Sequence, residues 1–289
     1  MFGFALLAAL LTAAPDAPAP ASSQPADDII VEGVRGQRKR VHEFVRALDD
    51  VPSFGQIAKF HSPVCPAVLG LPAEQSRRVA ERMKRVAASA GIRIGDARCA
   101  PNVFLIAAVG KGSTIEALNQ RFPAYFRGMS GKEVRKLASA TAPSVAWQVR
   151  GLLSADGTVL KQTQMGGPVI NEGTNSGSRV RAGTMPQFVA SMVVVERSAL
   201  TGLTTTQVAD FAAMRAFADT DPGRAAGAGA PTILTLLDKG DDQPLPITLT
   251  HWDLGYLKSL YATPNDYYAN YQRGEMERAM KKELEKAGQ

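Results

Sequence analysis

The chain has 289 residues, of which 45% are hydrophobic and 21% are charged, and its formal net charge is +6. This composition is typical of a globular protein that buries a core, and it argues against a disordered chain. The basic charge attracts polyanions non-specifically. No cluster of arginine and aromatic residues indicates base stacking, so we expect no specific nucleic-acid function.

The N-terminus has the pattern of an export signal. Residues 1–14 are apolar and uncharged, and a Pro/Ala/Ser-rich run follows over 15–26. The apolar part is shorter than the roughly 20 residues that cross a bilayer, but it has the length of a signal-peptide core. We therefore predict a signal peptide over 1–21 and a flexible spacer over 22–36. No Lys or Arg precedes the apolar stretch, so a buried N-terminal helix of a cytosolic protein is the alternative.

Two further features agree with export. Cys65 and Cys99 are the only cysteines, and an even count in an oxidising compartment predicts a disulfide between them. Residues 27–36 resemble the segment near the mature start of TonB-dependent receptors and other exported proteins of Gram-negative bacteria. The expected location is periplasmic or secreted, without a transmembrane segment after cleavage.

The first half of the folded part alternates between helix and strand patterns. Apolar spacing and capping residues predict helices over 37–50, 72–90, 113–121 and 130–140. Apolar or alternating runs predict strands over 56–60, 103–109, 145–153 and 188–195. A Gly/Ser/Asn-rich stretch over 166–183 predicts a long loop or a hairpin.

The last third has mainly helical patterns. We predict helices over 204–218 and 250–261, a Gly/Ala connector over 222–231, and a final helix with Pro264 at its first position. The expected fold is α+β, with a mixed sheet, flanking helices and a helix-rich C-terminal third. Residues 37–289 form either one globular region or two subdomains that divide between 142 and 143.

Familiar catalytic motifs are absent. Lys111 lies in a Gly-Lys-Gly-Ser-Thr turn after a strand, but the spacing differs from that of a phosphate-binding loop. His42, His61 and His251 are isolated from one another, and no Gly-x-Ser-x-Gly motif occurs. We therefore predict neither a metal nor a cofactor.

Residues 193–272 resemble a group of exported bacterial proteins with a zincin-like, metallopeptidase-related domain. The resemblance rests on a Gly-Leu-Thr start to one helix and on a later helix, which matches at Leu249, Thr250, Asp253, Leu257, Leu260 and Tyr261. The first helix reads Gln207-Val-Ala-Asp-Phe-Ala-Ala-Met-Arg215, without the His-Glu-x-x-His pattern that binds zinc. The resemblance implies the fold without the catalysis.

Two functions remain open from the sequence. The first is a non-catalytic binding or structural protein that contacts an unknown component of the cell envelope. The second is an exported hydrolase of peptide or glycan bonds, with Gln207, Asp210 and Asp253 as its candidate polar centre. Two buried carboxylates within about 6 Å of each other would favour the enzyme, because such pairs raise one pKa. Pairing of Asp210 with an arginine would favour the binding protein.

Overall fold

The structure is a computed structural model that describes residues 34–49, 51–162, 169–170, 177–238 and 245–287. The predicted signal peptide, most of the predicted spacer and part of the predicted long loop lie outside the described residues. No helix among those described is both long enough and apolar enough to cross a membrane.

A five-stranded mixed sheet forms the centre of the fold. Strands β2 (Pro66–Leu69), β3 (Val103–Ala108) and β7 (Thr184–Glu196) are parallel, in the order β2-β3-β7. On its other side β7 pairs antiparallel with β4 (Ser144–Ser154), while β1 (Lys59–Phe60) runs parallel to the first part of β7. Strands from both sides of the predicted division at 142/143 therefore share one sheet.

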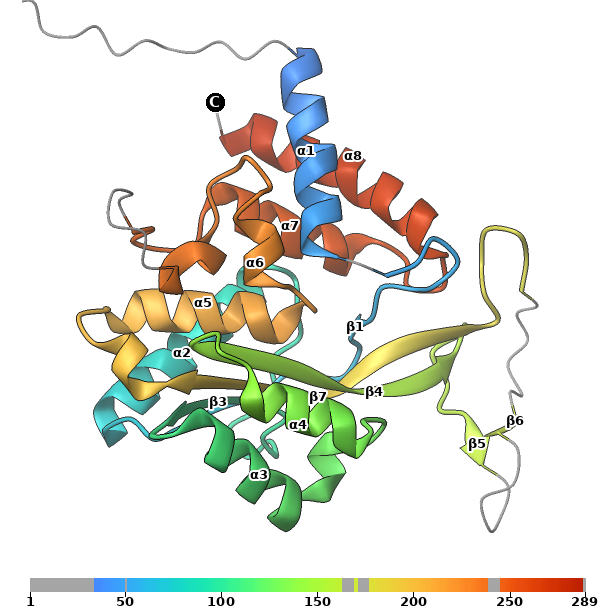
Figure 1. Cartoon of the computed structure of the whole chain (residues 1–289). Coiled ribbons are helices and arrows are strands. Elements are labelled where there is room, and N and C mark those ends of the chain that lie inside the picture. The colour runs from blue at the N-terminus through green and yellow to red at the C-terminus, as the bar shows by residue number, and fades with distance from the viewer. Residues whose placement is uncertain (1–33, 50, 163–168, 171–176, 239–244, 288–289) are drawn as a thin grey trace, which may run out of the picture.

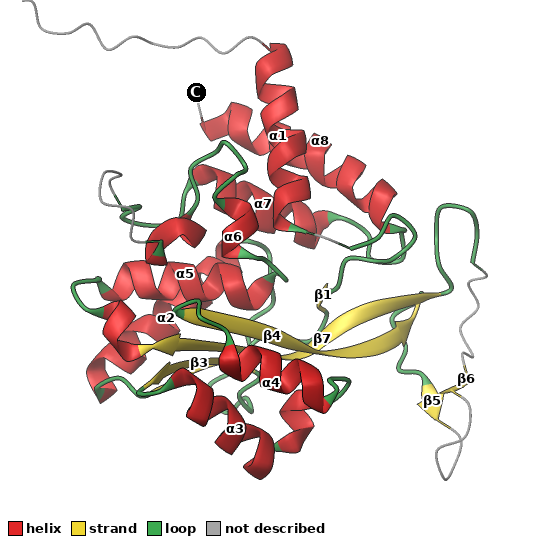
Figure 2. Cartoon of the chain, viewed as in Figure 1, coloured by secondary structure: helices red, strands yellow, loops and turns green. Residues whose placement is uncertain are grey.

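Helices cover both faces of this sheet (Figures 1 and 2). One face carries α2 (Ala73–Ser89) and α5 (Thr205–Phe217), and the opposite face carries α3 (Lys111–Arg121) and α4 (Gly131–Ser139). The prediction of an α+β fold with a mixed sheet and flanking helices is confirmed.

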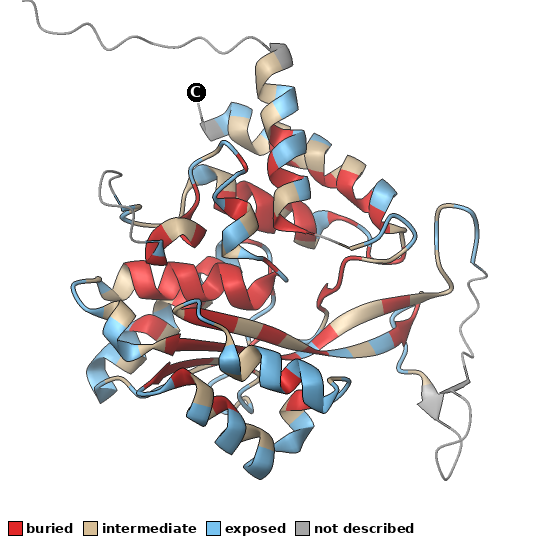
Figure 3. Ribbon diagram, viewed as in Figure 1, coloured by how far each residue is buried: buried red, intermediate tan, exposed pale blue. Residues whose placement is uncertain are grey.

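A third helical layer lies beyond α2 and α5. It contains α1 (Val34–Leu48), α7 (His251–Ala262) and α8 (Ala269–Ala287), so the C-terminal third is helix-rich as predicted. As a result α5 is enclosed from both sides, and every residue from Gln207 to Phe217 is buried (Figure 3).

Short elements connect these layers. They are η1 (Pro123–Phe126), β5 (Lys161–Gln162), β6 (Val169–Ile170), η3 (Arg197–Leu200), α6 (Pro222–Ala225) and η4 (Ile233–Leu237). The stretch predicted as a flexible connector over 222–231 contains α6. Ala225 and Ala228 anchor it because both side chains are buried in the main core.

Local sequence patterns predict most of the helix starts correctly. Ser130 and Glu133 form a reciprocal capping box at α4, and Thr204 and Gln207 do the same at α5. Pro264 does not begin the final helix, which starts only at Ala269. Asn265 donates to the His61 ring and to the Pro186 carbonyl, which holds this segment as a loop.

The predicted disulfide is present. Cys65 and Cys99 are joined with an S–S distance of 2.11 Å. Cys65 lies directly before β2 and Cys99 shortly before β3. Because these strands are parallel neighbours, their entry points meet at one edge of the sheet.

The N-terminal segment is bound to the C-terminal one. Arg273 Nε lies 2.5 Å from Asp49 Oδ2, both side chains being buried. The side chain of Gln272 accepts from the Ile57 amide at 2.6 Å, and the Ala269 amide donates to the Gly55 carbonyl at 2.8 Å. In the same layer α1 packs across α8 (Figure 1).

Candidate functional site

Asp210, one of the predicted catalytic residues, is engaged by other parts of the chain. Its side chain is 0% exposed. Arg82 of α2 donates to both carboxylate oxygens, from Nε at 2.7 Å and from Nη2 at 2.9 Å. The Thr248 hydroxyl and the Leu249 amide each donate at 2.7 Å. These four donors leave Asp210 as a structural anion that joins α2 to α5 and to the approach of α7.

Gln207 also has a structural role. Its Oε1 accepts from the Thr204 backbone amide at 3.0 Å, and the Gln207 backbone amide donates to the Thr204 hydroxyl at 3.2 Å. The remaining Nε2 group donates to the Pro246 carbonyl at 2.9 Å. The side chain therefore caps α5 and fixes the loop that leads to α7.

Asp253 has the same kind of role at α7. Its carboxylate accepts from the Thr232 hydroxyl at 2.6 Å and from the amides of Ile233 and Thr250 at 2.8 and 3.0 Å. Burial raises the pKa of this carboxyl, and the hydrogen bonds from Thr232, Ile233 and Thr250 oppose that rise. Asp253 and Asp210 share none of these hydrogen-bond donors.

The histidines are on separate elements. His42 Nδ1 lies 2.9 Å from Glu277 Oε1, His61 bonds to Asn265, and His251 is exposed at the start of α7. Among the described residues no three His, Cys, Asp or Glu side chains are placed to hold a metal ion.

The turn that contains Lys111 binds an internal anion. Helix α3 begins at Lys111, earlier than the predicted start at Ser113, and Gly110 precedes it with a φ of 82°. Glu196, at the end of β7, accepts from the amides of Lys111 at 2.6 Å and Gly110 at 3.2 Å. A carboxylate of the protein therefore occupies the helix N-terminus that a phosphate would otherwise use.

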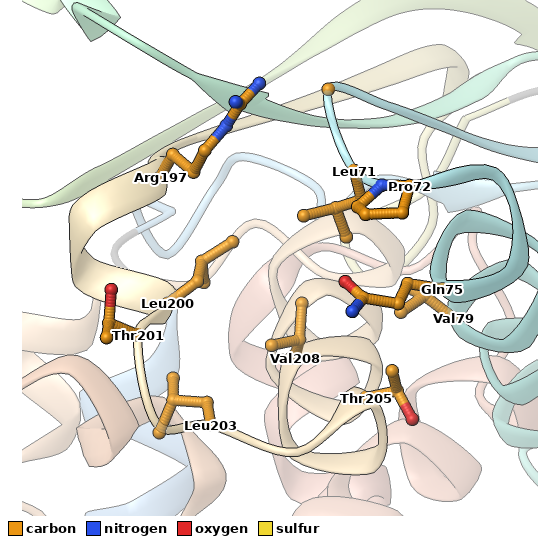
Figure 4. A pocket seen from close by; sticks show the side chains of 11 residues that line it. Leu71, Pro72, Gln75, Val79, Arg197, Leu200, Thr201, Leu203, Thr205 and Val208 are labelled. Atoms are coloured by element: carbon orange, nitrogen blue, oxygen red, sulfur yellow. The ribbon is translucent and has the colours of Figure 1, made fainter.

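The best candidate site is a pocket of about 340 Å³ at the carboxyl ends of β2 and β7 (Figure 4). We call it the strand-end pocket. It is lined by Gly70, Leu71, Pro72, Gln75, Val79, Arg197, Leu200, Thr201, Leu203, Thr205 and Val208.

Chain topology creates the strand-end pocket. After β2 and β7 the chain turns to α2 and α5 on one face, whereas after β3, which lies between them, it turns to α3 on the other face. Open α/β sheets bind ligands where neighbouring strands diverge in this way. Gly70 permits the first turn, since its φ is +82° and a Cβ atom would lie 2.1 Å from the Ala107 carbonyl oxygen.

The chemistry of the strand-end pocket is apolar with a polar rim. Leu71, Leu200 and Val208 extend into the same space from three elements (Figure 4). The side chains of Gln75 and Arg197 are exposed and form no hydrogen bond or ion pair within the described part of the chain. The α2 and α5 N-termini also border the pocket, so it favours a ligand with an apolar body and a negative group.

The sequence patterns did not single out this site. Gln75 and Arg197 have no motif around them, and they lie more than a hundred residues apart. The sequence features that could have indicated the pocket are the Gly70-Leu71-Pro72 turn after β2 and Arg197, which directly follows a long apolar strand.

Comparison of the chain with protein-family models, with curated proteins and with solved structures finds no match in any of the three. The class that the fold and site define is an α+β protein with a pocket at the carboxyl end of its sheet. The zincin-like resemblance of residues 193–272 remains a prediction.

Proposed function

We propose that the chain is an exported, non-catalytic protein of the Gram-negative cell envelope that binds another envelope component through the strand-end pocket. The observation that carries this proposal is that Gln207, Asp210 and Asp253 have structural roles inside the fold. Each of these candidate catalytic groups accepts its hydrogen bonds from neighbouring groups of the same chain.

The proposed location rests on the N-terminal pattern and on the disulfide. The apolar leader and its Pro/Ala/Ser spacer favour export. The bond between Cys65 and Cys99 supports an oxidising compartment, since structural disulfides are rare where thiols are kept reduced.

The pocket supports binding of an apolar segment that carries a carboxylate. Leucine, valine and proline side chains supply most of its wall, and Arg197 supplies a cation at the rim. Arginine suits a carboxylate because its planar guanidinium can donate two parallel hydrogen bonds.

The alternative, an exported hydrolase, has less support. A general acid or base needs a free proton-binding site near its substrate. Asp210 forms an ion pair with Arg82, which was the arrangement expected for a binding protein.

Site-specific photo-crosslinking in the producing cell tests the proposal. A photoreactive amino acid replaces Gln75 at the pocket rim, and a matched variant carries it at Glu116, exposed on α3 at the opposite face. We expect one defined cross-linked product from position 75, none from 116, and loss of the product when Arg197 is changed to Glu.

Intact mass of the protein recovered from the periplasm tests its location. We expect a mass that lacks the leader and rises by two hydrogen atoms on reduction. A cytosolic protein that retains the leader, stoichiometric bound zinc, or equal cross-linking from both positions would overturn the proposal.

A further inference from the structure

A second cavity, of about 420 Å³, lies at the other end of α5. We call it the Arg215 cavity. It is bordered by the end of α4, the start of β4, α5, α6 and the end of η4. It shares no lining residue with the strand-end pocket.

Arg215 is the unusual group in this cavity. Arg215 is only 6% exposed, yet no carboxylate among the described residues forms an ion pair with it. One guanidinium nitrogen, Nη1, donates to the Thr220 carbonyl, and the buried Nε has no partner. Burial lowers the pKa of Arg215 to about 10, although the charges of Asp219 and Asp221 oppose that shift, so the side chain stays charged at neutral pH.

The nearest acidic residues in sequence have other partners. Asp219 pairs with Arg150, and Asp221 accepts from the Gly223 amide at 3.0 Å as the cap of α6. Buried charges in proteins are generally paired, because an isolated charge loses its hydration without compensation. Arg215 lines the cavity and its Nη2 group forms no hydrogen bond to a described residue, so this donor matches an anionic group that enters the cavity from outside.

The remaining charges in the cavity restrict what this ligand can be. Asp221 and Asp238 also line it, and Asp238 is exposed, with no hydrogen bond or ion pair from its carboxylate to any described residue. Partial burial raises the pKa of Asp238. Two carboxylates would repel a simple anion, whereas a molecule that carries a carboxylate and an ammonium group balances both signs.

The rest of the wall is apolar. Leu137, Val145, Phe211 and Leu237 contribute to it, together with two prolines. A ligand that fills this space needs a hydrocarbon group as well as its two charges.

From these observations we propose that the Arg215 cavity binds a hydrophobic α-amino acid. Its carboxylate bonds to Arg215, its ammonium group lies near Asp238 at the mouth, and its side chain packs on Leu137, Phe211 and Leu237. This inference does not depend on the proposed function, because the two cavities are lined by different residues.

Calorimetric titration of the oxidised protein with leucine and phenylalanine tests the inference, with thermal unfolding as a second readout. We expect saturable binding and a raised Tm. N-acetyl-leucine lacks the ammonium charge and leucinamide lacks the carboxylate, so each should bind at least tenfold more weakly than leucine. No binding of either amino acid at millimolar concentration, or equal binding of the two derivatives, would overturn the proposal.

Three variants locate the binding. Arg215→Met replaces a buried, unpaired charge with an apolar side chain of similar length, so it should fold and lose leucine binding. Asp238→Asn changes an exposed side chain and should weaken binding at least tenfold. Arg78→Met, on the exposed face of α2 and outside both cavities, is the matched control and should bind leucine unchanged. If Arg215→Met does not fold, the affinity of Asp238→Asn for leucine shows whether the amino acid binds in the Arg215 cavity or elsewhere. Wild-type affinity in either cavity variant would place the amino acid elsewhere and contradict the proposal.

Discussion

Arg82 and Asp210 form a two-bond ion pair between α2 and α5, with nitrogen–oxygen distances of 2.7 and 2.9 Å. The two partners differ in environment, since the Asp210 side chain is 0% exposed and that of Arg82 is 29% exposed. The arginine can turn to water if the pair is broken, but the carboxylate cannot. The pair is therefore energetically asymmetric.

This asymmetry predicts unequal effects of mutating the two partners. Arg82→Met leaves a buried carboxylate with only Thr248 and Leu249 as donors, and it should lower the free energy of unfolding by about 3 kcal/mol. Asp210→Asn keeps the shape and frees Arg82 toward solvent, so it should cost less, about 1 kcal/mol. Urea unfolding of both variants measures the difference.

A matched control lies on the same helix. Arg78 pairs with Glu74, and both side chains are largely exposed. Arg78→Met should change stability by less than about 0.5 kcal/mol. Equal losses for Arg78→Met and Arg82→Met would contradict a special role for the buried pair.

The disulfide predicts a redox-dependent stability. Cys65 and Cys99 are 34 positions apart, and the chain-entropy model assigns about 4 kcal/mol to a closed loop of this size. Cys65→Ser should lose about this much relative to the oxidised wild type. Under reductant the two proteins should unfold at the same urea concentration, and a loss that persists there would mean that Cys65 acts through packing instead.

The buried Lys59 predicts that the free energy of unfolding depends on pH in the alkaline range. Its ammonium group is buried and donates to the carbonyls of Leu260, Tyr261 and Thr263 at the end of α7. Burial lowers its pKa from 10.5 to about 8. Between these pH values the unfolded chain binds the proton and the folded chain has released it, so stability rises with pH across this window.

The gain integrates to about 3 kcal/mol between pH 8 and 10.5. It is measured as the free energy of unfolding of the wild type minus that of Lys59→Met at each pH. The subtraction removes the contribution of the other titrating groups. A difference that is flat over this range would show that the folded and unfolded states bind the Lys59 proton equally.

Asp253 predicts a large loss for a helix cap. Asp253→Ala removes the acceptor for Thr232, Ile233 and Thr250 in a buried site and should cost about 3 kcal/mol. Glu133 occupies the same position in the capping box of α4 but is exposed, so Glu133→Ala should lower stability clearly less than Asp253→Ala. Chemical denaturation of both variants gives the comparison, and similar losses would show that burial adds nothing to the cap.

Local chemistry made part of this structure predictable. The capping boxes that start at Ser130 and Thr204 depend only on residues three positions apart, and the apolar run of β3 is continuous in sequence. The disulfide followed from a cysteine count of two. Such features need no knowledge of distant partners.

Long-range partners explain what the sequence did not show. Ser113 and Glu116 have capping-box spacing, but Glu196 from β7 binds the amides at the start of α3 and moves the helix start to Lys111. Arg82 has the spacing of an exposed helix residue, and the sequence does not identify its partner because Asp210 lies 128 positions away. Arg215 has the sequence spacing of an ordinary helix residue. Its burial depends on the elements that pack around α5, which the local sequence does not show.

The contacts between the two ends of the folded chain set the order in which it can fold. Phe44 and Val45 of α1 are buried in a core that includes Met276 and Met280 of α8. Asp49 forms its ion pair with Arg273 of the same helix. The packing of α1 is therefore incomplete until α8 has been synthesised. A chain that stops at Ala262 would expose the part of α1 that packs on α8, and contacts between residues so far apart in sequence slow folding.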